Sequence, residues 1–320
     1  MHGTAIAQPN IALIKYWGKR DIDRNLPAVG SISITLRELH TRMHVDFDRA
    51  LVADALTVNG EPDEKMLPRL SSCLDRVTGA ERPRARIVSS CNFPIAAGLA
   101  SSASSFAALT VAAAAAAGKS LDTGRLASLA GRASGSAARS LLGGYVELEN
   151  VGDDIACHSL CGADDWPLEV VVAITESGPK AVGSTEAMEI SRRTSPFYAS
   201  WVDRQAHDLD TARTAIAARD FEKLAAIAEH NCLKMHSIMW ASRPPMVYWN
   251  AATMRCLQTV RQLQGTGTGV FFTIDAGPQV KAVCLPGHAA EVETALRATA
   301  GVVDIMTTGL GEGARLESQG

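Results

Sequence analysis

The sequence predicts an α+β protein of two domains. The chain has 320 residues, 47% of them hydrophobic, which is enough to bury two cores of ordinary size. Short runs typical of β-strands dominate the first 90 residues, whereas long helical periods follow residue 175. The polar stretch TESGPKAVGS lies between the two patterns. We therefore expect one domain over 1–175 and a second over 176–320.

The first half is expected to begin with strands and to continue with helices. Runs rich in β-branched residues predict strands at TAIAQPNIALI, SISITL, RMHVDF and RIVSSC. The alanine-rich run from Ser102 to Ala117 predicts a helix that Gly118 ends. A second helix is expected over 123–134. The glycine-rich stretch 135–149 predicts a turn that runs into a strand.

The second half is expected to combine helices with a sheet. An apolar strand over 168–174 precedes a helix that Pro244 and Pro245 close. The buried face of that helix is predicted to hold Leu224, Ala228, Cys232, Met235 and Met239. Asn250 is placed to cap a further helix that stops at Gly265. Strands at GVFFTID, VKAVCL and GVVDIMTT, with a helix before the last of them, predict a sheet covered by helices on one side.

Charge and cysteine content exclude several classes of function. The net charge of −3 leaves no broad cationic surface, so nucleic acid is not an expected partner. The seven cysteines are odd in number, scattered and without a CxxC pair, which favours reduced thiols in the cytoplasm. The segment CHSLC is only a weak zinc signal. Neither a secretion signal nor an apolar run of about 18 residues is present, so we expect no membrane contact.

The stretch PIAAGLASSASS (94–105), directly ahead of the alanine-rich helix, is a candidate phosphate loop. Unpaired N–H groups and the helix dipole favour an anion at a helix start. Small residues let a triphosphate approach, and hydroxyls can bind phosphate oxygens or a metal ion. The residues concerned are Gly98, Leu99, Ala100, Ser101, Ser102 and Ser104. The alternative is that Ser101 only caps a buried helix, and no Walker or dinucleotide motif is present.

Two further clusters are candidates for a charged site. NIALIKYWGKRD ends an apolar strand with Lys15, Tyr16 and Lys19, which can wall a phosphate pocket or form a solvated hairpin end. ASGSAARS brings Arg139 together with serine hydroxyls, which suits the grip of a carboxylate. The alternative for ASGSAARS is a helix start with serine caps.

A carboxylate stands at the end of an expected buried strand. In FTIDAGPQV, Asp275 follows a nearly continuous apolar run and precedes an Ala-Gly-Pro turn. Such a residue is either a turn former or a reactive group, and the sequence leaves both open.

Taken together, these stretches resemble the mevalonate diphosphate decarboxylases of the GHMP small-molecule kinase superfamily. The matching pieces, in the family's order, are NIALIKYWGKRD, NLPAVGSISITL, NFPIAAGLASSAS with FAAL, SGSAARSLLGGYVE, DDWP, MHSIMWASRPPMVYWN and FTIDAGPQVKAVC. The resemblance implies a two-domain, GHMP-kinase-like α+β fold. Its first domain, which binds ATP, is expected to resemble domain 2 of ribosomal protein S5. A ferredoxin-like second domain completes the substrate site, and homodimers are implied.

The resemblance also implies a reaction. Enzymes of this family use ATP with magnesium to phosphorylate the 3-hydroxyl of mevalonate 5-diphosphate, and loss of phosphate and carbon dioxide then gives isopentenyl diphosphate. By similarity, Asp275 orients or deprotonates that hydroxyl and Lys15 lies close to it. Arg139 grips the C1 carboxylate, with Ser134 and Ser136 beside it.

The remaining roles concern phosphate groups. By similarity, Tyr16, Lys19 and Arg192 hold the 5-diphosphate. Ser101 and Ser102 hold the ATP phosphates with the backbone from Gly98 onward, and Ser102 also binds the metal. The alternatives left open are a mevalonate 5-phosphate decarboxylase, a mevalonate 3-kinase on the same fold and, more distantly, a non-catalytic module that binds RNA or a protein.

Overall fold

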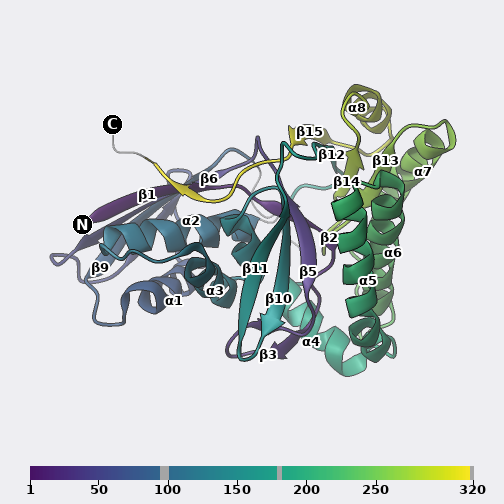
Figure 1. Cartoon of the computed structure of the whole chain (residues 1–320). Coiled ribbons are helices and arrows are strands. Elements are labelled where there is room, and N and C mark those ends of the chain that lie inside the picture. The colour runs from purple at the N-terminus through teal and green to yellow at the C-terminus, as the bar shows by residue number, and fades with distance from the viewer. Residues whose placement is uncertain (94–100, 179–181, 318–320) are drawn as a thin grey trace.

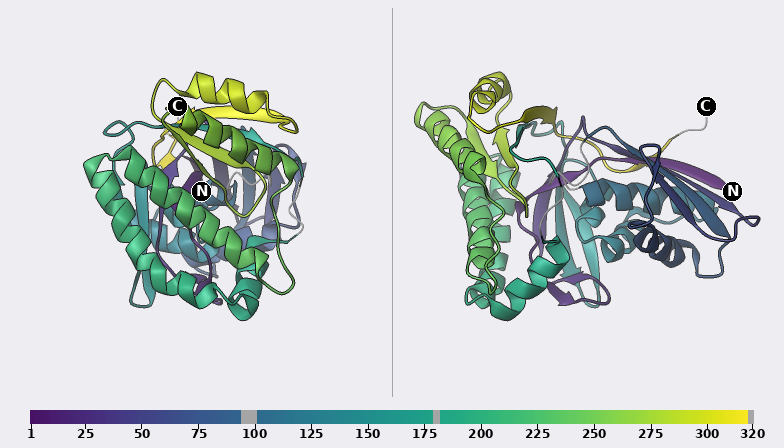
Figure 2. Two further views of the ribbon diagram at one scale, coloured as in Figure 1. Left: turned by 90° about the vertical axis from the view of Figure 1, so that its right-hand side faces the viewer. Right: turned by 180° about the vertical axis from the view of Figure 1, so that it is seen from behind.

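Figure 1 shows the computed structural model of the chain, which describes residues 1–93, 101–178 and 182–317. Within these ranges the first half of the chain builds two sheets with helices packed on them, and the second half builds one sheet and a set of longer helices. In Figure 2 the long helices of residues 198–240 form the outer wall of the second half.

The first sheet contains both the beginning and the end of the described chain. Its strands are β1 (His2–Ala7), β6 (Thr41–Asp48), β7 (Ala55–Val58), β8 (Glu61–Pro62), β9 (Arg84–Cys91) and β16 (Arg315–Leu316). Their order is β16-β1-β6-β9-β7-β8, antiparallel except for the β7–β9 pair. Because β16 pairs with β1, the last residues return to the first half, a connection that the sequence pattern did not predict.

An alanine-rich helix lies at the centre of the first half. The helices here are α1 (Leu67–Thr78), α2 (Ser101–Ala116) and α3 (Thr123–Ala133), which confirms the two helices expected over 102–117 and 123–134. α2 lies between the first sheet and the other two helices (Figure 1), and a helix that is apolar all round is a buried one. Small residues permit this close packing: a Cβ on Gly3 would come within 2.4 Å of the carbonyl oxygen of Ala112.

The second sheet lies between the first-half helices and the second half of the chain. Its strands are β2 (Asn10–Ile14), β5 (Ser31–Thr35), β10 (Tyr145–Val151) and β11 (Asp154–Cys161), in the order β11-β10-β5-β2. A small hairpin of β3 (Lys19–Asp21) and β4 (Leu26–Pro27) follows β2. Ahead of β10, the glycine-rich stretch expected to be a plain turn contains the 3-10 helix η1 (Ala137–Leu141), which fixes the backbone of Arg139.

The third sheet belongs to the second half. Its strands are β12 (Glu169–Ile174), β13 (Val270–Thr273), β14 (Val280–Cys284) and β15 (Asp304–Gly309), in the antiparallel order β13-β14-β12-β15. The helices are α4 (Ser184–Thr194), α5 (Tyr198–Ala218), α6 (Phe221–Trp240), α7 (Ala251–Gly265) and α8 (Ala289–Arg297). As expected, Asn250 caps α7 with a capping box, and the predicted apolar face of α6 is buried.

The two halves share one apolar cluster. One face of the third sheet packs against α7 and α8. The prediction of helices on one side alone was wrong, because Phe221 of α6 packs against Phe271 of β13 on the other face. The other face joins a cluster that includes Ile11 and Ile34 of the second sheet and Val170 and Val172 of β12. This shared core holds the end of β2 and the end of β13 against each other: Thr273 Oγ1 donates a hydrogen bond of 3.1 Å to the carbonyl of Ala12.

Candidate active site

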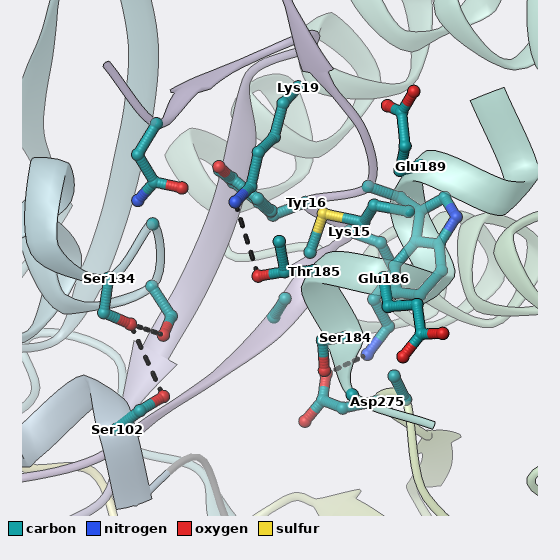
Figure 3. Close-up of a pocket in the computed structure, with 18 of the residues that line it drawn as sticks. Lys15, Tyr16, Lys19, Ser102, Ser134, Ser184, Thr185, Glu186, Glu189 and Asp275 are labelled. Atoms are coloured by element: carbon teal, nitrogen blue, oxygen red, sulfur yellow. Dashed lines mark hydrogen bonds and ion pairs between the residues drawn. The ribbon is translucent and has the colours of Figure 1, made fainter. Parts of the chain in front are cut away.

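A cavity of about 900 Å³ lies where the two halves meet. Its wall includes the residues after β2, the beginning of α2, η1 and the turn before it, the first turn of α4 and the residues after β13. Figure 3 shows side chains from all these segments pointing into one space. Most of the side chains singled out from the sequence line it: Lys15, Tyr16, Lys19, Ser102, Ser134, Ser136, Arg139 and Asp275.

Asp275 is the carboxylate at the centre of the second-half wall. It follows β13, whose hydrogen bonds with β14 and contact with β2 fix the backbone at Ile274. Lys15 Nζ lies 2.8 Å from Asp275 Oδ1, and Lys281 Nζ lies 3.3 Å from Oδ2. Burial raises the pKa of Asp275, but the two ammonium groups outweigh burial and hold the pKa well below its ordinary value. The carboxylate is therefore ionised at neutral pH.

Arg139 is the buried cation on the first-half wall, with 2% of its surface exposed. Its Nε donates to Ser33 Oγ at 3.0 Å, its Nη1 to Ser31 Oγ at 2.6 Å and its Nη2 to Asn10 Oδ1 at 3.2 Å. A guanidinium has five N–H donors, so these three bonds leave two for a ligand. Burial lowers the pKa of Arg139 from its ordinary high value, and the group stays charged.

Serine hydroxyls connect η1 with the start of α2. Ser134 Oγ lies 3.4 Å from both Ser102 Oγ and Ser136 Oγ (Figure 3). α2 begins at Ser101, so its first N–H groups face the same end of the cavity as these hydroxyls. Ser104, by contrast, is fully buried and lies 2.8 Å from Thr41 Oγ1, against the sheet and not on the cavity wall. The other predicted ATP-binding residues, Gly98, Leu99 and Ala100, lie outside the described residues.

Tyr16 and Lys19 line the end of the cavity at which α4 begins. Burial raises the pKa of Tyr16 well above its ordinary value, so its hydroxyl stays protonated. That hydroxyl lies against Gly135, where a Cβ would come within 2.4 Å of it, which explains the glycine. Lys19 Nζ donates to Thr185 Oγ1 at 3.3 Å (Figure 3), and burial and then the neighbouring Arg69 lower its pKa.

The first turn of α4 faces the same end. Gly183 caps this helix, and Ser184 and Thr185 line the cavity, so a second helix start contributes N–H groups to it. Arg192 lies in the last turn of α4, where its guanidinium binds Glu189 at 2.6 and 2.9 Å. Arg192 is not itself on the cavity wall, but Glu189, to which it is bound, is.

Several charged or polar residues of the site escaped the sequence analysis, among them the cavity-lining Ser184, Thr185, Glu186 and Glu189 of α4. Asn10 binds Arg139, Arg69 lines the cavity beside Lys19, and Lys281 binds Asp275. For Lys281 a signal existed, because a lysine inside the apolar strand VKAVC must be paired to be buried. Arg69 gave none, since it belongs to a helix, α1, that the sequence did not predict.

The donor set around the cavity is of the kind that magnesium uses together with phosphates. Within residues 1–93, 101–178 and 182–317 no group of three or more His, Cys, Asp or Glu side chains is placed to hold a metal ion. Mg²⁺ commonly takes one or two protein oxygens, with substrate phosphates and waters completing its shell. The Ser102 hydroxyl fits that pattern.

The described residues contain no helix long and apolar enough to cross a bilayer.

Comparisons with known proteins agree with this arrangement. Two family models match, one described as the diphosphomevalonate decarboxylase-like N-terminal domain over residues 7–160, and one as the mevalonate 5-diphosphate decarboxylase C-terminal domain over residues 170–312. A diphosphomevalonate decarboxylase of Candida albicans is 32% identical over 300 residues, covering 87% of this chain and 83% of the relative.

Solved structures match over nearly the whole chain. The mevalonate diphosphate decarboxylase of Staphylococcus aureus is 33% identical, with a TM-score of 0.93 over 99% of this chain and 98% of that one. A second structure, described as MDDEF in complex with MVAPP, AMPPCP and magnesium, is 32% identical, with a TM-score of 0.92 over 100% and 99% of the two chains.

Proposed function

The chain belongs to the diphosphomevalonate decarboxylase family, and on this premise we propose that it catalyses the ATP-dependent decarboxylation of mevalonate 5-diphosphate to isopentenyl diphosphate, ADP, phosphate and carbon dioxide. One observation carries the proposal: a carboxylate held ionised, Asp275, and a buried guanidinium with free donors, Arg139, face one cavity that two helix starts border. This arrangement suits a substrate with a hydroxyl, a carboxylate and a diphosphate.

Asp275 receives the tertiary hydroxyl. Its carboxylate accepts a hydrogen bond from the O–H and aims the oxygen at the γ-phosphorus of ATP. A positioned acid–base group contributes about 10²–10⁴-fold to such a step. Because the two lysines keep its pKa low, Asp275 acts mainly by orientation, and its carboxylate takes up the proton only as the O–P bond forms and the hydroxyl becomes acidic. Lys15 is close enough to Asp275 to balance charge on the transferring group.

Arg139 receives the C1 carboxylate. Its two remaining N–H groups can make a paired contact with a carboxylate, and a fixed pair of donors sets the direction of the C1–C2 bond. When the 3-phosphate departs, the electron pair of that bond forms the double bond and carbon dioxide leaves. Too strong a neutralisation of the carboxylate would oppose this step, so the contribution of Arg139 is orientation.

The phosphates occupy the helix starts. We place the 5-diphosphate against Tyr16, Lys19 and the first turn of α4, with Arg192 joining only if it releases Glu189. The ATP phosphates lie against Ser101, Ser102 and the start of α2. Magnesium fits at Ser102, where it would neutralise charge on the phosphate oxygens. In the bound relative, AMPPCP, MVAPP and magnesium occur together.

Two finer assignments complete the proposal. The strand order β13-β14-β12-β15, with helices between β12 and β13 and between β14 and β15, supports a ferredoxin-like second domain. For the first domain we propose the S5-domain-2-like fold, and for the whole protein a homodimer in the cytoplasm. Light scattering on purified protein should give twice the monomer mass, and a monomer at micromolar concentration would contradict the dimer.

The substrate assay distinguishes this reaction from its alternatives. Mevalonate 5-diphosphate and mevalonate 5-phosphate are each supplied with ATP and magnesium, and ADP and carbon dioxide are both measured. We expect equal amounts of ADP and carbon dioxide, with the diphosphate preferred. ADP without carbon dioxide would indicate a 3-kinase, and preference for the monophosphate would indicate the related decarboxylase. RNA binding without nucleotide turnover would contradict an enzyme altogether.

A further inference from the structure

β14 carries a charged side chain that the fold by itself does not require. The strand reads VKAVC, and all five of its residues are buried. Lys281 stands opposite Thr273 of β13, and Val283, two residues further along β14, belongs to the apolar cluster shared by the two halves. The lysine thus occupies an apolar position of the interface between the halves, with 1% of its side chain exposed.

A buried ammonium is costly unless a partner compensates it. Burial lowers the pKa of Lys281, and the charge of Asp275 opposes that effect. Breaking such a buried pair typically costs 3–5 kcal/mol, whereas an apolar residue of similar size is often at least as stabilising as the pair itself. The ion pair with Asp275 is thus one reason for a lysine at this position of the strand.

We propose that Lys281 is a positioning residue for Asp275. Its Nζ contacts Oδ2 at 3.3 Å while Lys15 Nζ contacts Oδ1 at 2.8 Å, so the carboxylate is held at both oxygens from two different elements. Held in this way, Asp275 cannot rotate toward either lysine alone, and the substrate hydroxyl meets an ionised oxygen in a fixed direction. The role of Asp275 in this statement rests on the proposed function.

The other groups that face Asp275 do not replace Lys281. Arg139 acts from the first-half wall at longer range, and three of its five donors are bound to Ser31, Ser33 and Asn10.

From α6 come His236 and Cys232, and both are neutral. Burial lowers the pKa of His236 to about 3 and raises that of Cys232. Removal of Lys281 therefore leaves Lys15 as the one close cation of Asp275 among the described residues.

The first test uses Lys281→Met, which keeps an unbranched side chain of nearly the same length and removes its charge. We expect kcat to fall roughly 10- to 100-fold, as for other losses of positioning, while both KM values change less than about threefold. The acid limb of the kcat profile should also move to higher pH, because the pKa of Asp275 rises when a cation is lost and the reaction needs the ionised form. Val283→Ala is the matched control: it weakens the same face of β14 and should lower Tm without moving the acid limb.

The second test measures thermal stability and does not depend on catalytic activity. Tm is measured for wild type, Asp275→Asn, Lys281→Met and the double variant. Asp275→Asn leaves two ammonium groups without a carboxylate, so it should lower Tm, and adding Lys281→Met should restore part of that loss. If the two changes simply add, the lysine is not coupled to Asp275 and the proposal fails.

The two tests separate this proposal from the proposed function. Wild-type protein that forms no carbon dioxide would refute the function, while restoration of Tm in the double variant would still support the ion pair. An active wild type whose Lys281→Met variant keeps its kcat and its acid limb would overturn the positioning role and leave the function standing.

Discussion

Two regions of the cavity compensate buried charge in opposite ways. In the Arg139 region, a guanidinium is hydrogen-bonded to the neutral oxygens of Ser31, Ser33 and Asn10. Neutral partners orient a cation without cancelling its charge. Within the part of the chain that the structure describes, Arg139 has no ion-pair partner, which suits a site for a substrate carboxylate.

In the Asp275 region, two positive charges compensate one negative charge. One carboxylate lies between the ammonium groups of Lys15 and Lys281, each with 1% of its side chain exposed. An excess of positive charge keeps Asp275 ionised and suits the arrival of negatively charged phosphates. The difference agrees with our proposal that the Arg139 region binds a charged group of the substrate, whereas the Asp275 region prepares a neutral hydroxyl for reaction.

The largest effect is expected for Asp275→Asn, which removes the acceptor of the hydroxyl. Turnover should fall by about 10²–10⁴-fold, because the amide neither carries the charge nor accepts the proton as well. Nucleotide affinity, measured by titration with a fluorescent ATP analogue, should stay within about threefold, since the nucleotide is placed at α2. A purified variant with full activity would remove Asp275 from the mechanism.

Arg139→Lys should have the next largest effect. An ammonium is a point charge and cannot reproduce the paired donors, so kcat should fall roughly 10- to 100-fold while calorimetry still detects substrate binding. Arg82→Lys is the matched control, because Arg82 is also a buried arginine, paired with Asp54 at 2.6 Å on the other side of the first half. The control should lose stability and keep its kcat, and an unchanged kcat for Arg139→Lys would contradict the carboxylate grip.

Ser31→Ala tests whether the hydrogen bonds to Arg139 orient its guanidinium. It deletes the acceptor 2.6 Å from Arg139 Nη1 and leaves the charge in place. Loss of one hydrogen bond to a charged group should lower kcat/KM roughly tenfold. In the Arg139→Lys background the same change should have less effect, because its target is gone, and equal effects in both backgrounds would contradict the assignment.

The expected effect of His236 is on stability: this residue lies below the Asp275 region, and its Nε2 is 3.3 Å from the carbonyl of Ile274. Its pKa in the folded protein is about 3, below the ordinary value of 6.5. The unfolded chain therefore takes up the proton first, and stability should decline as the pH falls from 6.5 toward 3, by at most about 1.4 kcal/mol per pH unit. Urea unfolding across this range checks the slope, and a His236→Gln variant with the wild-type slope would contradict it.

Much of this account could be predicted from the sequence, and the exceptions have physical causes. Periodicity revealed α2, α3 and α6, because a buried helix face repeats regularly. Local motifs pointed to Arg139 and Asp275, since turn and strand-end chemistry is visible in a few residues. The return of β16 to β1 was not predictable, because it depends on pairing between the two ends of the chain.

Partners of the site residues were the hardest to predict. Asn10 and Arg139 are separated by more than a hundred residues, and only the folding of the first half brings β2 and η1 together. Lys15 and Asp275 are also far apart in the sequence, and the shared core of the two halves brings them together. Arg192 shows the converse case. The family resemblance predicts that Arg192 binds phosphate. In this structure the guanidinium of Arg192 is bound to the carboxylate of Glu189, one helical turn away on α4.

The comparison of the two regions is tested most directly by a single turnover of the Arg139→Lys enzyme. Enzyme in excess is mixed with mevalonate 5-diphosphate and radiolabelled ATP, quenched at intervals, and analysed for 3-phosphorylated substrate and carbon dioxide. If the Asp275 region directs phosphorylation and the Arg139 region directs decarboxylation, the phosphorylated intermediate accumulates while carbon dioxide lags behind it. If ADP and carbon dioxide slow in the same proportion and no intermediate appears, the two regions do not serve separate steps.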